Sequence, residues 1–160
     1  MTEPPAGAAE IVPYRRELLA GILAVAAAEG WPSLVADEER AHRVLTAPGV
    51  TTVVATAGEV VGFAQLQSDG EIQAHLSLIA VVPAWRRQGI GGRLVAEALH
   101  RGGGLRVGLV TDSADAFYKS LPHRRFEGYR LYPRGERPAG SSPASRRPSG
   151  RAAKPPRRAA

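Results

Sequence analysis

Residues 78–94 read LIAVVPAWRRQGIGGRL, and this stretch determines how the rest of the chain is interpreted. Its first part is an apolar run, typical of a strand, that stops at Pro83. A turn rich in arginine and glycine follows, and apolar residues then recur at helical spacing, beginning with Ile90 and Leu94. We therefore expect a strand, a tight turn and an amphipathic helix over residues 87–101.

The turn between these two elements is suited to hold an anion. Gly89, Gly91 and Gly92 lack a Cβ atom, so a ligand can approach the backbone closely. The start of a helix also presents free N–H groups and the positive end of the helix dipole. Three arginines raise the local positive potential: Arg86, Arg87 and Arg93. The turn predicts a phosphate or pyrophosphate site. The alternative is a tight turn without a ligand, in which the glycines are needed only for steric reasons.

Two common phosphate-binding motifs do not fit this turn. A Walker loop requires Gly-Lys-Ser or Gly-Lys-Thr, and no such sequence follows the glycines. The dinucleotide fingerprint Gly-x-Gly-x-x-Gly is also absent, and the turn comes late in the chain.

The remaining sequence divides into segments of distinct periodicity. Helical patterns occupy 15–29, 37–47 and 113–121, with Asp112 as the expected cap of the last helix. Strand patterns occupy 11–14, 50–57, 60–67, 71–82, 105–111 and 126–132, of which 105–111 reads as a buried strand. A linker at 31–33 and a hairpin turn at 68–70 separate some of them.

This order of elements predicts a single α/β (α+β) domain over residues 11–133. The sheet is expected to be mixed and mostly antiparallel, with helices on both faces. The strands at 71–82 and 105–111 are joined by a crossover helix and should therefore be parallel. Residues 1–10 are expected to be a flexible N-terminus.

The formal net charge of +6 arises from the end of the chain. Residues 1–133 have a net charge of −1, whereas residues 134–160 have a net charge of +7. The tail is rich in proline, serine and arginine and lacks large apolar residues, so we expect it to be disordered. It is either a solvated extension or a basic arm for RNA, DNA or an acidic partner.

Composition excludes several other classes of protein. The chain has no cysteine, and hence no disulfide, thiolate zinc site or cysteine nucleophile. No apolar run approaches the about 18 residues of a membrane span, and the acidic, proline-containing start is unlike a signal peptide. The histidines His42, His100 and His123 show no metal-ligand spacing. We therefore expect a cytoplasmic protein without a metal or membrane partner.

The stretch 78–94 resembles the acetyl-CoA motif of the GNAT acyltransferase superfamily, Gln/Arg-x-x-Gly-x-Gly/Ala after the fourth strand. The order of elements agrees with that family over nearly all of residues 11–132. The resemblance implies that the turn holds the pyrophosphate of acetyl-CoA and that the preceding strand lines its pantetheine arm. The residues implied are Ile79, Ala80, Val81, Arg86, Arg87, Gln88, Gly89, Ile90, Gly91, Gly92 and Arg93.

The same resemblance, together with side-chain chemistry, indicates catalytic residues. Residues 111–118 resemble the family segment Asn-x-x-Ala-x-x-x-Tyr, although Thr111 replaces the Asn. Tyr118 is therefore the candidate acid that protonates the leaving thiolate, with a packing tyrosine as the alternative. His75 lies eleven residues before Arg86, where several family members place a catalytic Glu or His.

His75 is the candidate base, because a histidine can accept a proton at physiological pH. A histidine satisfied within the sheet is the alternative. We expect it to share one strand face with Glu71, Gln73, Ser77 and Ile79, and Glu71 is the reserve base.

We therefore expect an N-acetyltransferase that transfers acetyl from acetyl-CoA to a small-molecule or peptide amine, without a metal. Trp31 either borders the acceptor pocket or packs in the core. A non-catalytic acyl-CoA-binding module and a nucleic-acid-associated protein that binds through its tail are the alternative functions. A homodimer is left open.

Overall fold

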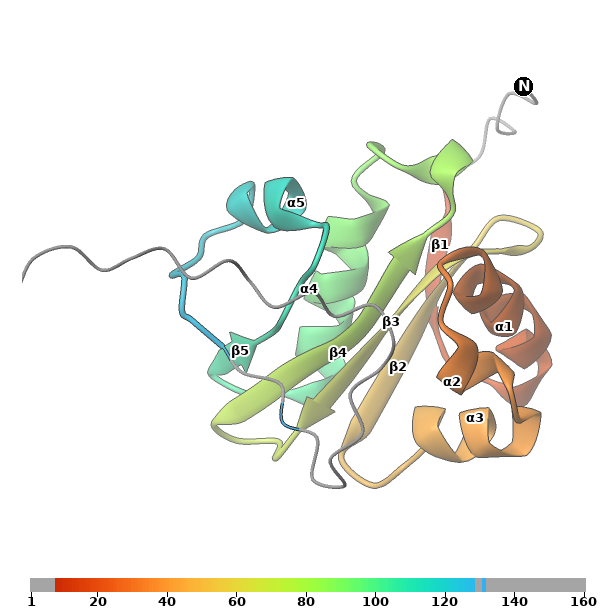
Figure 1. Cartoon of the computed structure of the whole chain (residues 1–160), viewed down its shortest axis with the longest axis horizontal. Helices are drawn as coiled ribbons and strands as arrows, with labels where there is room; N and C mark the ends of the chain where they lie inside the picture. Colours follow the sequence, from red (N-terminus) through yellow and green to blue (C-terminus); the bar gives the residue numbers. More distant parts are fainter. Residues whose placement is uncertain (1–7, 129–130, 132–160) are drawn as a thin grey trace, which may run out of the picture. The chain divides into compact units, whose positions relative to one another are not determined.

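The computed structural model describes residues 8–128 and 131, and its centre is a five-stranded sheet in the order β1-β2-β3-β4-β5 (Figure 1). The first four strands pair antiparallel, and β5 pairs parallel to β4. This confirms a mixed, mostly antiparallel sheet. The strands are β1 (Glu10–Pro13), β2 (Val50–Thr56), β3 (Val60–Ser68), β4 (Gln73–Val81) and β5 (Arg106–Gly108).

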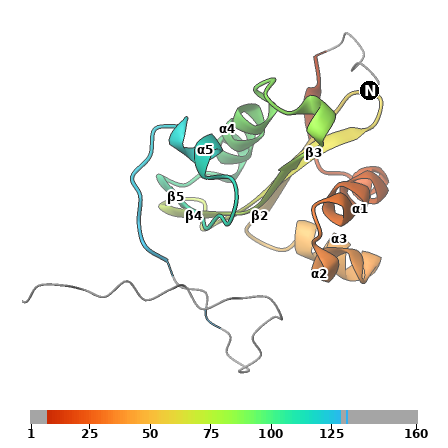
Figure 2. The same cartoon turned by 45° about the horizontal axis from the view of Figure 1, so that its top comes forward.

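Helices cover both faces of the sheet, as expected (Figure 2). One face carries α1 (Leu19–Ala28), α2 (Pro32–Val35) and α3 (Glu38–Leu45), and we call it the α1–α3 face. The opposite face carries α4 (Ile90–Gly102) and is called the α4 face; α5 (Asp115–Lys119) lies beside α4. Short 3₁₀ turns occupy Arg16–Leu18 and Pro83–Trp85.

Each face has its own hydrophobic core. On the α4 face, fully buried Leu94 and Ala98 pack with Val53, Val61 and Leu66 of the sheet. On the α1–α3 face the corresponding residues include Leu19, Ile22, Leu45, Val54 and Phe63. The two cores hold the central strands between them, so the sheet is a fixed frame for any site at its edge.

A β-bulge in β4 changes which side chains share a face. Gln65 of β3 lies opposite Leu78 of β4, but the next residue, Leu66, lies opposite Leu76, so Ser77 has no partner in the register. The extra residue reverses the alternation of side chains along β4. Leu76 before the bulge and Ile79 after it both pack on the α4 face. The expectation that His75 and Ile79 share a face is therefore wrong.

Strands β4 and β5 diverge to form a fork. They pair at only three positions: Gln73 with Arg106, Ala74 with Val107 and His75 with Gly108. β4 continues for six more residues, whereas the chain after Gly108 turns away toward α5 (Figure 1). The expected buried strand at 105–111 is thus only three residues long, and Leu105 and Val110 at its ends are 79% and 55% exposed.

Other elements differ from expectation in their bounds. The first helix begins with a 3₁₀ turn, and the expected linker at 31–33 contains the start of α2, where Pro32 occupies the first turn. β1 begins at Glu10, and the preceding Ala9 is buried. Before α5 the Thr111 hydroxyl accepts a hydrogen bond from the Ala114 amide, and Ala114 is the residue that precedes the helix. The expected Asp112 cap is therefore wrong.

Residues 124–160 form a second unit, of which the structure describes 124–128 and 131. The described residues 124–128 and 131 contain no strand, in contrast to the expectation for 126–132, and the guanidinium of Arg124 lies 5.0 Å from the ring centre of Phe126. The remaining residues of that expected strand and the whole basic tail lie outside the described residues.

The bulge generates a stability prediction for Ser77→Ala. The Ser77 hydroxyl oxygen is buried and has no hydrogen-bond partner in the described part of the chain. Removing it should raise the free energy of unfolding by about 1 kcal/mol, because a buried, unsatisfied hydroxyl destabilises the folded state. Urea unfolding followed by circular dichroism measures the change.

Ser68→Ala is the matched control. The Ser68 hydroxyl donates to the Gly103 carbonyl oxygen (3.2 Å) and accepts from the Gly70 amide (2.9 Å). Its loss should lower the free energy of unfolding by about 1 kcal/mol. A Ser77→Ala protein that is destabilised as much as Ser68→Ala would contradict the assignment of an unsatisfied hydroxyl.

Candidate active site

The glycine-rich turn uses two residues with left-handed backbone to redirect the chain into α4. Arg87 has φ 62° and Gly89 has φ 77°, and α4 begins at Ile90 rather than at Arg87. Gly89 adopts this conformation without strain, whereas a non-glycine residue such as Arg87 adopts it rarely. The expected helix start is therefore three residues too early, because the helical spacing of apolar residues does not reveal the left-handed residues before it.

The start of α4 is open to a ligand. No side chain caps it, and a Cβ atom built on Gly89 or Gly92 meets nothing within 4 Å. The first hydrogen bond of the helix runs from the Arg93 amide to the Gly89 carbonyl (3.1 Å). The backbone N–H groups that come before Arg93 in the helix therefore have no carbonyl partner within it. This arrangement fits a bound phosphate or pyrophosphate.

The arginines of the turn play different structural roles. Arg86 donates from Nε to the Val81 carbonyl oxygen (2.7 Å) and forms an ion pair with Glu29 (2.6 Å). Its charge is therefore offset by a carboxylate, which the sequence interpretation missed. Arg87 and Arg93 have exposed side chains without a hydrogen-bond or ion-pair partner in the described part of the chain. These two arginines provide the free positive charge beside the open helix start.

Helix α5 lies against this end of α4 through a glycine–aromatic contact. A Cβ atom on Gly91 would lie 3.1 Å from the ring of Phe117, so the absence of a side chain at 91 lets α5 approach. Phe117 and Tyr118 form an edge-on pair with ring centres 5.0 Å apart. Gly91 thus links the turn with the segment that carries Tyr118, a role that the sequence motif did not indicate.

Tyr118 has the environment of a protonated donor. It is half-buried and packs against the hydrophobic cluster of the α4 face. Burial raises the pKa of its hydroxyl above the usual value of 10.0. The hydroxyl therefore stays protonated at neutral pH, as an acid that donates to a thiolate must be.

Among the residues that the structure describes, the fork leaves one edge of β4 without a strand partner after His75. The side chains of Ile79 and Val81 pack on the α4 face and Ala80 packs on the α1–α3 face, so they are not directed along the sheet. The groups directed into the fork are therefore backbone N–H and C=O groups. An extended, amide-containing ligand can pair with such an edge.

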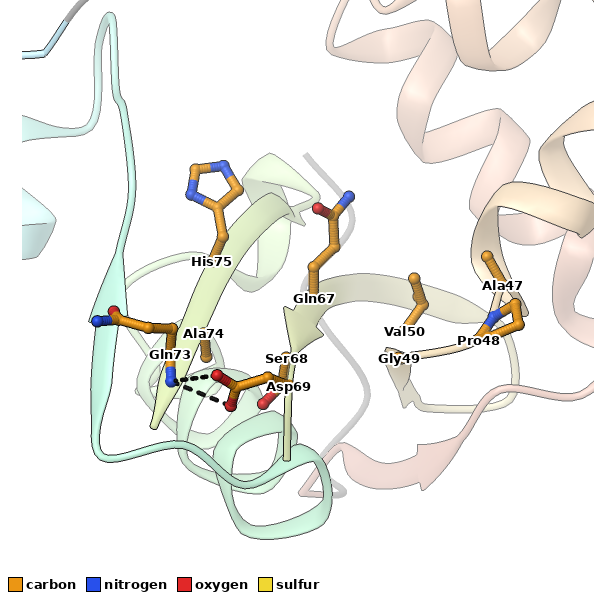
Figure 3. A pocket seen from close by; sticks show the side chains of 10 residues that line it. All are labelled: Ala47, Pro48, Gly49, Val50, Gln67, Ser68, Asp69, Gln73, Ala74 and His75. Atoms are coloured by element: carbon orange, nitrogen blue, oxygen red, sulfur yellow. Dashed lines mark hydrogen bonds between the residues drawn. The ribbon is translucent and has the colours of Figure 1, made fainter. Parts of the chain in front are cut away.

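His75 lies where the two strands separate. It forms the last β4–β5 pair, its side chain is exposed, and its cross-strand neighbour on β3 is Gln67. Figure 3 shows both side chains on the same side of the sheet, opposite Ala74 and Ser68. Because Ala74 packs on the α4 face, His75 belongs to the α1–α3 face, whereas Tyr118 packs on the α4 face.

The expected position of Glu71 is corrected by the structure. β4 begins at Gln73, and Glu71 lies in the preceding turn, where its amide donates to the Asp69 carboxylate (2.9 Å). It is exposed and does not continue the row of side chains that contains His75. The sequence interpretation placed the strand start two residues early, because Glu71 and Ile72 continue the alternating pattern.

The two tryptophans lie in different layers. Trp31 makes an edge-on contact with the Phe63 ring (centres 6.1 Å apart) on the α1–α3 face, so packing is its observed role. Trp85 is 6% exposed and belongs to the core of the α4 face. Within residues 8–128 and 131, no group of three His, Asp or Glu side chains is placed to hold a metal ion. Over the same residues, no helix combines the length and apolarity needed to cross a membrane.

Comparison with known proteins gives matches to part of the chain. Residues 48–121 match the model of the acetyltransferase (GNAT) domain. A stretch of 69 residues is 46% identical to mycothiol acetyltransferase of Rhodococcus jostii (strain RHA1) and covers 41% of this chain. The homologous enzyme of Rhodococcus opacus (strain B4) is 45% identical over the same length. The match spans only 23% of the length of each of these relatives.

Solved structures share the fold over most of the chain. A GNAT-family acetyltransferase from Streptococcus pneumoniae TIGR4 is 26% identical, with a TM-score of 0.64 over 79% of this chain and 98% of that chain. An aminoglycoside N-acetyltransferase in complex with CoA is 21% identical, with a TM-score of 0.63 over 80% of this chain and 96% of that chain, and shows the fold alone. Together these matches confirm the resemblance predicted from the sequence: residues 48–121 match a GNAT acetyltransferase domain, and the fold is that of GNAT acetyltransferases.

The arginine geometry generates a second stability prediction. Arg86→Ala should lower the free energy of unfolding by about 1 kcal/mol, because it removes the bonds to Glu29 and to the Val81 carbonyl. Arg87→Ala is the neighbouring control and should change stability less, because Arg87 lacks such partners in the described residues. Thermal unfolding of both variants measures the difference, and equal destabilisation would contradict the distinct roles of the two arginines.

Proposed function

We propose that this protein is an N-acetyltransferase that transfers the acetyl group of acetyl-CoA directly to a primary amine. The observation that carries the proposal is that two features follow one another along the chain, the first on β4 and the second at the start of α4. Within the described residues β4 has an unpaired edge where it separates from β5, and it leads through the turn into the open start of α4. A ligand with an extended amide arm and a pyrophosphate can occupy both features at once.

The residues of the turn and the fork fit acetyl-CoA. The α4 start, from Gly89 to Gly92, would hold the pyrophosphate through backbone N–H groups, with Gln88 and Ile90 inside the same turn. Arg87 and Arg93 would add positive charge, and Arg86 would brace the turn through Glu29 and Val81. The backbone of Ile79, Ala80 and Val81 would pair with the pantetheine arm.

Acetyl-CoA supplies the acetyl group as a thioester. His75 would accept a proton from the acceptor amine, because an ammonium ion has no lone pair with which to attack. Glu71, acting through water, is the second candidate for this step. Backbone N–H groups of β4 would polarise the carbonyl. A C–N bond forms as the C–S bond breaks, and Tyr118 would donate its hydroxyl proton to the departing thiolate.

The positions of His75 and Tyr118 support this division of roles. His75 is on the α1–α3 face and Tyr118 packs against the α4 face, so the two groups lie on opposite sides of the sheet. In the tetrahedral intermediate of a direct transfer the nitrogen and the sulfur are separate substituents of one carbon, so a base and an acid can reach them from different directions. The names of the relatives, mycothiol acetyltransferase and aminoglycoside N-acetyltransferase, support acetyl transfer.

The cofactor proposal predicts that acetyl-CoA raises the melting temperature of the purified, CoA-free protein. Gly91→Val should abolish this shift, because its side chain would collide with Phe117 and crowd the helix start. Arg87→Ala should weaken acetyl-CoA binding more than Arg86→Ala does, since the Arg86 charge is offset by Glu29. Differential scanning fluorimetry and isothermal titration calorimetry provide the measurements.

No shift with the CoA-free wild-type protein would refute the cofactor proposal. A shift without acetyl transfer to any amine would favour the alternative of a non-catalytic acyl-CoA-binding module. A panel of amines, scored by acetyl-CoA-dependent thiol release, separates these outcomes. The absence of cysteine removes protein thiols from the background of this assay.

The catalytic roles predict that Tyr118→Phe retains acetyl-CoA binding but lowers kcat by about 10²-fold or more, the usual loss when a general acid is removed. Because burial raises the Tyr118 pKa, the donor stays protonated and the wild-type rate should show no loss attributable to Tyr118 below about pH 10. His75→Asn should lower kcat by a similar factor, while His100→Asn, on exposed α4 surface, should not.

Rates and pH profiles of these variants test the assignment. An unchanged kcat in Tyr118→Phe would remove Tyr118 from the mechanism. An unchanged kcat in His75→Asn together with a large loss in Glu71→Gln would transfer the role of base to Glu71.

A further inference from the structure

An open depression lies beside the fork on the α1–α3 face (Figure 3). Its polar wall includes Gln67, Asp69, Gln73 and His75, and its apolar wall includes Pro48 and Val50 from the segment that follows α3. His75 belongs both to this depression and to the last pair of the β4–β5 fork. A ligand in the depression would therefore lie beside the point where the strands separate.

The acidic group of the depression is already engaged. The Asp69 carboxylate accepts hydrogen bonds from the backbone amides of Glu71 (2.9 Å), Ile72 (2.8 Å) and Gln73 (3.1 Å). These amides hold the pKa of Asp69 below its usual value, so the carboxylate is stabilised as part of the turn. Asp69 is the only carboxylate among the residues that line the depression, all of which belong to the described part of the chain.

The groups left to bind a ligand are two amides and an imidazole. The side chains of Gln67, Gln73 and His75 are exposed and have no hydrogen-bond partner within the described residues. Gln65, two residues before Gln67 on β3, is by contrast buried and donates to the Val44 carbonyl (2.9 Å). The free amides each present two donors and an acceptor, which match hydroxyl and amide groups on a ligand.

We propose that this depression is the acceptor site and that it selects an amine with a single positive charge and neighbouring hydroxyl or amide groups over a polyamine. The inference rests on the proposed function and names its substrate class. Among the lining residues a second ammonium group would meet only the Asp69 carboxylate, whose oxygens already accept three backbone amides, whereas hydroxyl groups can bond to Gln67 and Gln73.

A matched pair of amines tests the selection. The pair is 2-amino-1,3-propanediol, with one amine and two hydroxyls, and 1,3-diamino-2-propanol, with the same carbon skeleton but two amines and one hydroxyl. With the full chain and saturating acetyl-CoA, kcat/KM should be about fivefold or more higher for the monoamine. The first amine panel should likewise rank hydroxylated monoamines above polyamines of similar size.

Charge variants connect this preference to the depression. Gln73→Glu adds a free carboxylate there and should shift the ratio of the two kcat/KM values toward the diamine by about two- to fivefold, the range of one exposed ion pair. Ala96→Glu adds the same charge on exposed α4 surface and should leave the ratio unchanged. Gln67→Ala should raise KM for the monoamine and leave the acetyl-CoA thermal shift unchanged.

Each result is decisive. A wild-type enzyme that uses the diamine as well as the monoamine, or Gln73→Glu and Ala96→Glu ratios that do not differ, would overturn the inference while the acetyltransferase function stands. Absence of turnover with every amine of the panel would overturn the proposed function and the inference with it. The monoamine preference together with its loss in Gln73→Glu supports the inference.

Discussion

The structure depends on an incomplete strand pairing. β4 is paired with β3 from Ala74 to Val81, but it is paired with β5 only as far as His75. A strand edge presents N–H and C=O groups that require hydrogen-bond partners. At the centre of a domain these partners must be water or a ligand when no strand supplies them. The folded domain therefore contains, within its own sheet, an edge with which a ligand backbone can pair. In the proposed reaction the pantetheine arm completes the sheet.

The bulge at Ser77 determines what surrounds this opening. By reversing the alternation within β4, it places His75 on the α1–α3 face and Ile79 on the α4 face, only four residues apart. The α4 face then carries the cofactor side of the proposed site, with the open helix start, Phe117 and Tyr118. The α1–α3 face carries the acceptor side, with Gln67 and His75. One extra residue thus separates the two substrates of the proposed reaction.

Periodicity and the glycine-rich motif predicted three features correctly: the mixed sheet, the helices on both faces and the strand–turn–helix unit. It could not predict the bulge, because Ser77 satisfies a simple alternation as well as its neighbours do. It also could not predict that Arg86 pairs with Glu29, since these residues meet only through the fold. A strand was predicted at 105–111, but its short length was not, because Leu105, Leu109 and Val110 read as buried, although Leu105 and Val110 are exposed.

The placement of the two tryptophans has a spectroscopic consequence. Trp31 contacts Phe63 in one layer, and Trp85 is buried in the other layer beside the turn. They are the only tryptophans of the chain. Replacing either one by phenylalanine leaves a single fluorophore, so emission from each layer can be followed separately. The molecule thus carries an intrinsic optical reporter on each side of its sheet, and the unfolding of the two layers can be compared without any added label.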